Sequence, residues 1–151
     1  MDTREAYEQA ARLHENLQKE ALNMGVSEEY ISTLVDTFYG KVRADADLGP
    51  IFDQVIGDNW GPHLAKMKRF WGALALRTGD YEGEPMRAHL NLEGVAPEHF
   101  ETWLALFRET LKETAPSEGC AAYFQQFADK IAARFRSAMF GYRRDASLPN
   151  A

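Results

Sequence analysis

The segment EPMRAHLNL at residues 84–92 contains the histidine on which the interpretation of the rest of the chain depends. Pro85 can open a helical turn, because the first position of a helix does not need its backbone N–H. His89 follows one turn later, between the apolar residues Ala88 and Leu90. A lone histidine in such surroundings is more often a core residue held by a hydrogen bond than a metal ligand. The remainder of the sequence has to distinguish these two interpretations.

The composition is that of one globular domain. The chain has 151 residues, of which 45% are hydrophobic, and this length is sufficient for a core without disulfides or metals. A net charge of −6 lacks the basic excess of a nucleic-acid-binding protein. Charged residues stand where a signal peptide would be apolar, and no apolar run is long enough to span a bilayer. The single cysteine, Cys120, excludes an internal disulfide, and we expect a cytoplasmic protein.

Apolar residues recur with helical spacing along most of the chain, and no segment alternates with a period of two for long. We therefore expect an all-α fold of packed helices. The first helix runs from Thr3 to about Met24, stops at Gly25 and is expected to lie on the core through its apolar stripe. Residues 48–52 read as a short turn. Further helices are expected to begin near Ser27, Pro62, Pro97 and Ser117.

Several kinds of site are excluded by their missing motifs. The sequence has no GxGxxG, P-loop, HExxH or CxxC motif. A zinc site would need three or four ligands at short spacings, and a hydrolase would need a nucleophile beside a base. Neither arrangement is recognisable. Among the four histidines, we expect His14 and His99 at the surface, whereas His63 and His89 lie in apolar surroundings.

Two facing imidazoles near a hydroxyl and an indole N–H would suit a flat iron porphyrin. One histidine would bind the iron, and the polar groups on the other side would contact its ligand. The helices also carry aromatic residues that could line a cofactor pocket, although periodicity alone favours an ordinary hydrophobic core for them. These residues are Phe38, Phe52, Phe70, Trp71, Phe100, Trp103 and Phe107.

A family resemblance now becomes specific. The segments that match are FYGKVR at 38–43, DLGPIF at 47–52, TGDYEGEP at 78–85 and FETWLALF at 100–107. The stretches between these segments contain further matches in the same order, namely Trp60, His63, Phe70–Trp71 and His89–Leu90. The chain from about Ser27 to Arg144 resembles a group III truncated haemoglobin. On this basis we divide it into an N-terminal helical extension at 1–26, a truncated globin domain at 27–144 and a C-terminal tail at 145–151.

The resemblance implies a two-on-two helical sandwich around a non-covalent haem b, iron protoporphyrin IX. His89 matches the proximal iron ligand, and Tyr39, His63 and Trp103 match the distal polar residues. Phe52 matches the aromatic that packs on the haem, and Lys66 is a candidate partner for a haem propionate. The other expected pocket residues are Phe38, Met67, Phe70, Trp71, Leu90 and Phe107, with Met67 standing where the family often has a branched aliphatic residue.

The implied function is reversible binding of O2 and other diatomic ligands such as NO and CO. Tyr39 and Trp103 would donate hydrogen bonds to O2, and His63 would act as a further donor, a gate or a sixth iron ligand. Such a polar pocket favours ligand capture or redox detoxification over transport. Two alternatives stay open. One is a nitric oxide dioxygenase or haem peroxidase with a separate reductase, and the other is a haem-free helical module that recruits a partner through its first helix.

Overall fold

Helices make up nearly all of the part of the chain that the computed structural model describes, residues 2–78 and 94–141. The elements are α1 (Thr3–Asn23), α2 (Glu28–Ala44), α3 (Leu48–Ile56), α4 (Trp60–Ala75), α6 (Pro97–Thr114), α7 (Glu118–Arg136) and a π-helical turn at Ser137–Gly141. No strand occurs in these ranges, so the predicted all-α class is confirmed. No helix within them is long and apolar enough to cross a membrane.

Most helix boundaries lie where local chemistry predicts them. The Ser27 side chain accepts a hydrogen bond from the Tyr30 N–H at 3.0 Å, and Ser117 caps α7 in the same way. Pro97 is the first residue of α6. Gly25, with φ +91°, follows α1 in a conformation that L side chains rarely adopt. These local signals account for the start of α2, α6 and α7 and for the end of α1.

The prediction of a short turn at residues 48–52 is wrong, because these residues belong to α3. The Asp45 carboxylate accepts the N–H groups of Asp47 and Leu48, both at 2.9 Å, and so satisfies donors at the start of the helix. Gly49 is required for the close approach of α3 to α2. A Cβ atom there would lie 2.5 Å from the carbonyl oxygen of Arg43.

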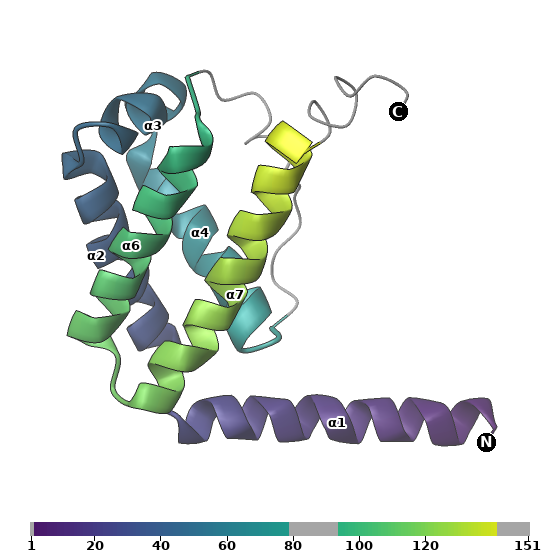
Figure 1. The fold of residues 1–151 in the computed structure, drawn as a ribbon. Coiled ribbons are helices and arrows are strands. Elements are labelled where there is room, and N and C mark those ends of the chain that lie inside the picture. Colours follow the sequence, from purple (N-terminus) through teal and green to yellow (C-terminus); the bar gives the residue numbers. More distant parts are fainter. Residues whose placement is uncertain (1, 79–93, 142–151) are drawn as a thin grey trace, which may run out of the picture.

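The helices form two packed pairs, α2 with α4 and α6 with α7, and α2 also crosses α6 (Figure 1). This is the two-on-two sandwich expected from the sequence. Three phenylalanines, Phe38 of α2, Phe107 of α6 and Phe124 of α7, are almost completely buried where the pairs meet. The core therefore lies between the two pairs, with α3 at one end.

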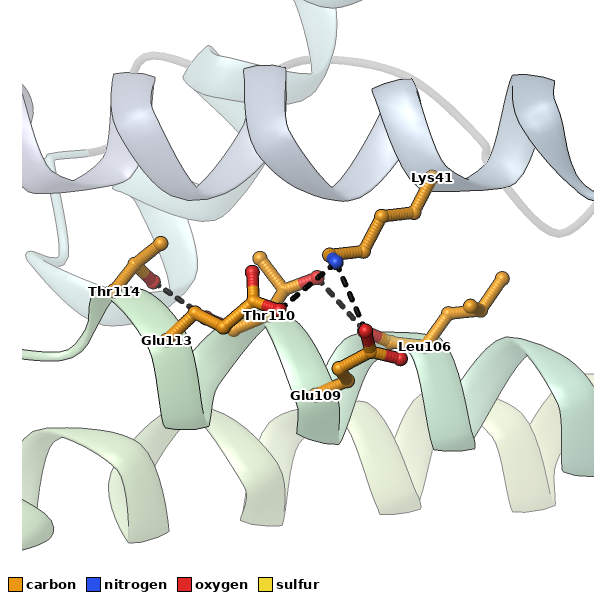
Figure 2. A network of polar contacts seen from close by, with 6 residues as sticks. All are labelled: Lys41, Leu106, Glu109, Thr110, Glu113 and Thr114. Carbon is orange, nitrogen blue, oxygen red and sulfur yellow. Dashed lines mark hydrogen bonds and ion pairs between the residues drawn. The ribbon is translucent and has the colours of Figure 1, made fainter.

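Polar contacts tie α2 to α6 at two points. Near the C-terminal end of α2, the Lys41 ammonium lies 3.1 Å from carboxylate oxygens of both Glu109 and Glu113 (Figure 2). Near its start, the Tyr30 hydroxyl is 2.9 Å from the hydroxyl of Thr114. The two contacts are about three helical turns apart on α2, but their partners on α6 lie within about one and a half turns, so together they fix how α2 lies against this part of α6. This arrangement matters because each helix contributes to the site described below.

The prediction that α1 lies on the core is wrong for most of its length. Figure 1 shows α1 extending away from the other helices. Ala21 is its one buried residue, whereas Tyr7 and Leu13 are 77% and 59% exposed. Among the described residues, α1 contacts the body through its last turns, where the Gln18 amide donates to the Leu76 carbonyl at 2.9 Å. The apolar stripe consists mostly of alanine and leucine and is narrow, so it offers little area to bury.

Two truncations should therefore differ in stability. Residues 2–16 are all exposed, so we expect deletion of residues 1–16 to change the free energy of unfolding by no more than about 0.5 kcal/mol. Deleting residues 1–25 also removes Ala21 and the Gln18 hydrogen bond, which should cost roughly 1–3 kcal/mol. Urea unfolding of both proteins measures the difference. An equal loss from the two deletions would show that the exposed part of α1 is also stabilised by packing.

Candidate functional site

Four rings from three helices meet at one end of the sandwich. Tyr39 of α2 is central, and the centroids of the Phe52, Trp60 and His63 rings lie 6.3, 6.1 and 5.4 Å from its own. Phe52 belongs to α3, and Trp60 and His63 belong to the first turns of α4. The fold thus brings together three of the residues expected in the pocket, and it adds Trp60 to them.

Tyr39 is a neutral hydrogen-bond donor. Its side chain is 6% exposed, and burial raises the pKa of its hydroxyl far above the ordinary value for tyrosine. Burial therefore favours the neutral, protonated hydroxyl. A buried tyrosine tip of this kind can donate to a polar partner that enters its apolar surroundings.

His63 lies against Tyr39 at a right angle. The two rings are inclined by 89°, and the Nε2 atom of His63 is buried although the residue as a whole is half-buried. Its position on the apolar side of α4 is the one that its spacing predicts. Tyr39 and His63 together form a small polar region within an aromatic cluster.

Trp103 approaches the same region from α6. Its ring is perpendicular to that of Phe38 at 5.2 Å and is stacked on Phe107 at 5.6 Å. Phe38 in turn contacts Tyr39 at 5.1 Å, and Phe107 stacks on Trp71 at 5.2 Å. Phe38, Phe107 and Trp71 are all buried, so their role in this structure is to pack behind Tyr39 and Trp103.

An apolar pocket opens beside Phe52 and Trp103, between α3, α6 and α7. Its lining in the described residues comprises Leu48, Ile51, Phe52, Val95, His99, Phe100, Trp103, Ile131, Ala132, Phe135 and Met139. The contribution of α7 was not predicted as part of a site, although Ile131 and Phe135 lie on its apolar stripe. The stripe shows which face is buried, but not that a pocket lies in front of it.

The expectation that His99 lies at the surface is wrong. His99 is half-buried, lines the pocket, and accepts a hydrogen bond from the Ala96 N–H through Nδ1 at 2.8 Å. It thereby satisfies a backbone donor at the start of α6, where Ala96 has no polar side chain to act as a cap. This use of histidine depends on the turn geometry and leaves no periodic signal in the sequence.

Comparison with known proteins identifies the family. The chain is 40% identical over 120 residues to the group 3 truncated haemoglobin ctb of Campylobacter jejuni, an alignment that covers 78% of this chain and 94% of that protein. The chain belongs to the group III truncated haemoglobins. A crystal structure of the group III truncated haemoglobin from the same organism superposes with a TM-score of 0.73, over 78% of this chain and 94% of that one. No protein-family model matches the chain.

Truncated haemoglobins are haem proteins, and the described residues fit that cofactor. The pocket is almost wholly apolar, as the faces of a porphyrin require, and Phe52 in its lining contacts the buried Tyr39. Within residues 2–78 and 94–141, no three His, Cys, Asp or Glu side chains gather to hold a bare metal ion. Cys120 is buried, and burial raises the pKa of its thiol to about 11.

The remaining predicted residues of this truncated haemoglobin are distributed along α4 or lie outside the described ranges. Met67 is buried at 8% exposure, Phe70 is half-buried against Trp71, and Lys66 is exposed. His89 and Leu90 fall within residues 79–93, outside the residues that the structure describes. Their assignments therefore stay predictions from the sequence.

Proposed function

We propose that this truncated haemoglobin binds haem b through His89 and reversibly binds O2, NO, CO or related diatomic ligands. The observation that supports this most directly is the buried, neutral Tyr39 hydroxyl beside His63, close to an apolar pocket. Haem, when bound, supplies an iron atom that takes up such gases. The residues of the chain supply a dry pocket and hydrogen-bond donors on one side of it.

The donors determine which ligands are retained. Tyr39 O–H and Trp103 Nε1–H can donate to a ligand that carries partial negative charge, and His63 can add a third donor or open the pocket to solvent. A hydrogen bond to a charged acceptor is worth about 1.5–3 kcal/mol. With two or three donors, the pocket holds O2 too strongly for efficient delivery. We therefore propose ligand capture or redox detoxification rather than transport.

Other residues have supporting roles in this proposal. Phe52, which is buried and lines the pocket, packs on the haem, and Met67 forms part of the distal wall. Lys66 is exposed on α4 and can reach a haem propionate. The haem-binding unit is residues 27–144, so both truncations of α1 described above should retain haem.

Absorption spectroscopy tests the function. Purified protein should show an intense Soret band that shifts on reduction and shifts again with CO. Colourless protein that cannot be reconstituted with haem would favour a helical interaction module instead. Turnover of NO or peroxide with a reductase and an electron donor would assign the enzymatic alternative, in which the same donors act on the substrate.

A further inference from the structure

The indole of Trp60 is held by side chains from two other helices. Its Nε1–H donates to Oδ1 of Asp53 in α3 at 2.9 Å. The guanidinium carbon of Arg43 in α2 lies 4.5 Å from the centroid of the indole, and Arg43 Nε is 3.9 Å from Asp53 Oδ1. A cation over an aromatic face and an N–H donated to a carboxylate are both attractive. We call these three residues, Arg43, Asp53 and Trp60, the Trp60 anchor.

Another part of the same indole contacts His63. The two rings are 5.6 Å apart and inclined by 89°, and His63 makes a second right-angled contact with Tyr39 at 5.4 Å. The imidazole therefore lies in a corner between two larger rings, which are themselves 6.1 Å apart. Rotation of His63 towards solvent would give up both edge-to-face contacts.

The first turn of α4 has no capping side chain, so contacts with other helices contribute to its position. The N-cap residue Asn59 makes no side-chain hydrogen bond to the turn. Gly61 follows in the first turn and is a poor helix former. Trp60 and His63 are three residues apart, so they are neighbours on one side of α4. The anchor therefore positions the turn from which His63 projects, in place of a capping side chain.

We propose that Trp60 is a positioning residue that holds His63 against Tyr39 and opposes its rotation to solvent. This inference rests on the proposed function, in which the Tyr39 side of the pocket receives the diatomic ligand. Arg43 and Asp53 act through Trp60. The strength of the anchor then sets how often His63 leaves its position against Tyr39, and with it the rate at which ligands enter.

Chemical labelling of histidine tests the proposal without any ligand. Diethyl pyrocarbonate modifies accessible imidazoles, and peptide mass spectrometry gives a rate for each histidine in the full-length protein as purified. His14, exposed on α1, is the internal reference. Trp60→Leu should raise the rate at His63 relative to His14 by about three- to tenfold, as the loss of one edge-to-face contact predicts. Asp53→Ala, which keeps the indole, should raise it by about twofold to threefold.

Tyr30→Phe is the matched control. It removes one hydrogen bond, to Thr114, at the opposite end of α2, and it leaves the Trp60 anchor intact. Its labelling ratio should equal that of the wild type, although its stability to urea is also lowered. An equal rise in this control would show that general loosening exposes His63, and that result would overturn the proposal.

The result that would overturn the proposal is an unchanged labelling rate of His63, relative to His14, in folded Trp60→Leu. If that variant does not fold, the same result in Asp53→Ala decides.

The rate of carbon monoxide association separates this inference from the proposed function. Faster CO entry in the variants supports the role of Trp60, whereas normal CO binding with unchanged labelling overturns that role alone. A wild-type protein without a Soret band would refute the proposed function, and the labelling ratios would still decide how Trp60 acts on His63.

Discussion

Replacing His89 by alanine is expected to abolish stable haem binding. The proposal gives the iron a single protein ligand on its proximal side, and alanine has no atom that can bind a metal. Most of the Soret absorbance should therefore be lost after purification. The haem-to-protein ratio and the rate of haem transfer to an excess of apomyoglobin measure the effect. The variant should remain helical by circular dichroism, because the described core consists mainly of side chains from α2, α4, α6 and α7, none of which is changed.

The control for His89→Ala should be another histidine whose loss disturbs nothing else. His14→Ala is suitable, since His14 is exposed on α1, and its haem content should equal that of the wild type. His99→Ala is a less clean control. His99 accepts the Ala96 N–H at the start of α6 and lines the pocket, so its loss should cost about 1 kcal/mol of stability while haem is retained. An unchanged spectrum in His89→Ala would contradict the proximal assignment.

Removing the distal donors is expected to accelerate O2 release by roughly tenfold or more in each of Tyr39→Phe and Trp103→Phe. Both substitutions keep an aromatic ring, and Tyr39→Phe keeps the contacts with Phe38, Phe52 and Trp60 as well. The change in O2 release therefore reports the loss of one hydrogen bond to a ligand that carries charge. Stopped-flow measurement of O2 release from the two variants tests the size of the effect.

Carbon monoxide provides the control for this second prediction. Bound CO carries much less charge than bound O2, so its release should change far less in Tyr39→Phe and Trp103→Phe. Equal effects on the two ligands would indicate a change of pocket shape and would contradict the hydrogen-bond model. The two substitutions need not be additive, because both donors address one ligand and the remaining donor can reorient.

Local signals in the sequence were sufficient for most of the helices. Ser27, Ser117 and Pro97 act on the backbone within a few residues of themselves, so a helix start can be recognised without the rest of the fold. The turn predicted at residues 48–52 is the exception. Its glycine and proline are typical of a turn. The Asp45 carboxylate, which accepts the first N–H groups of α3, lies outside residues 48–52.

The candidate site was predictable only in part. The Tyr39, His63 and Trp103 positions follow from the resemblance, and their apolar surroundings follow from helical periodicity. Trp60 matched the family without an assigned role. Its interaction partners, Arg43 and Asp53, belong to two other helices, and no spacing within α4 could have revealed them. His99 was misplaced for a similar reason, because its burial depends on how α6 meets α3 and α7.

The sequence alone determined the all-α class, the family resemblance and most helix boundaries, because periodicity, caps and the spacing of motifs within one chain segment are local properties. The tertiary structure alone decided which apolar faces are covered. The stripe of α1 is as regular as that of α2, yet α1 extends into solvent while α2 is buried between α4 and α6. An amphipathic pattern specifies that a helix has an apolar face, but the area available on neighbouring helices determines whether that face is buried.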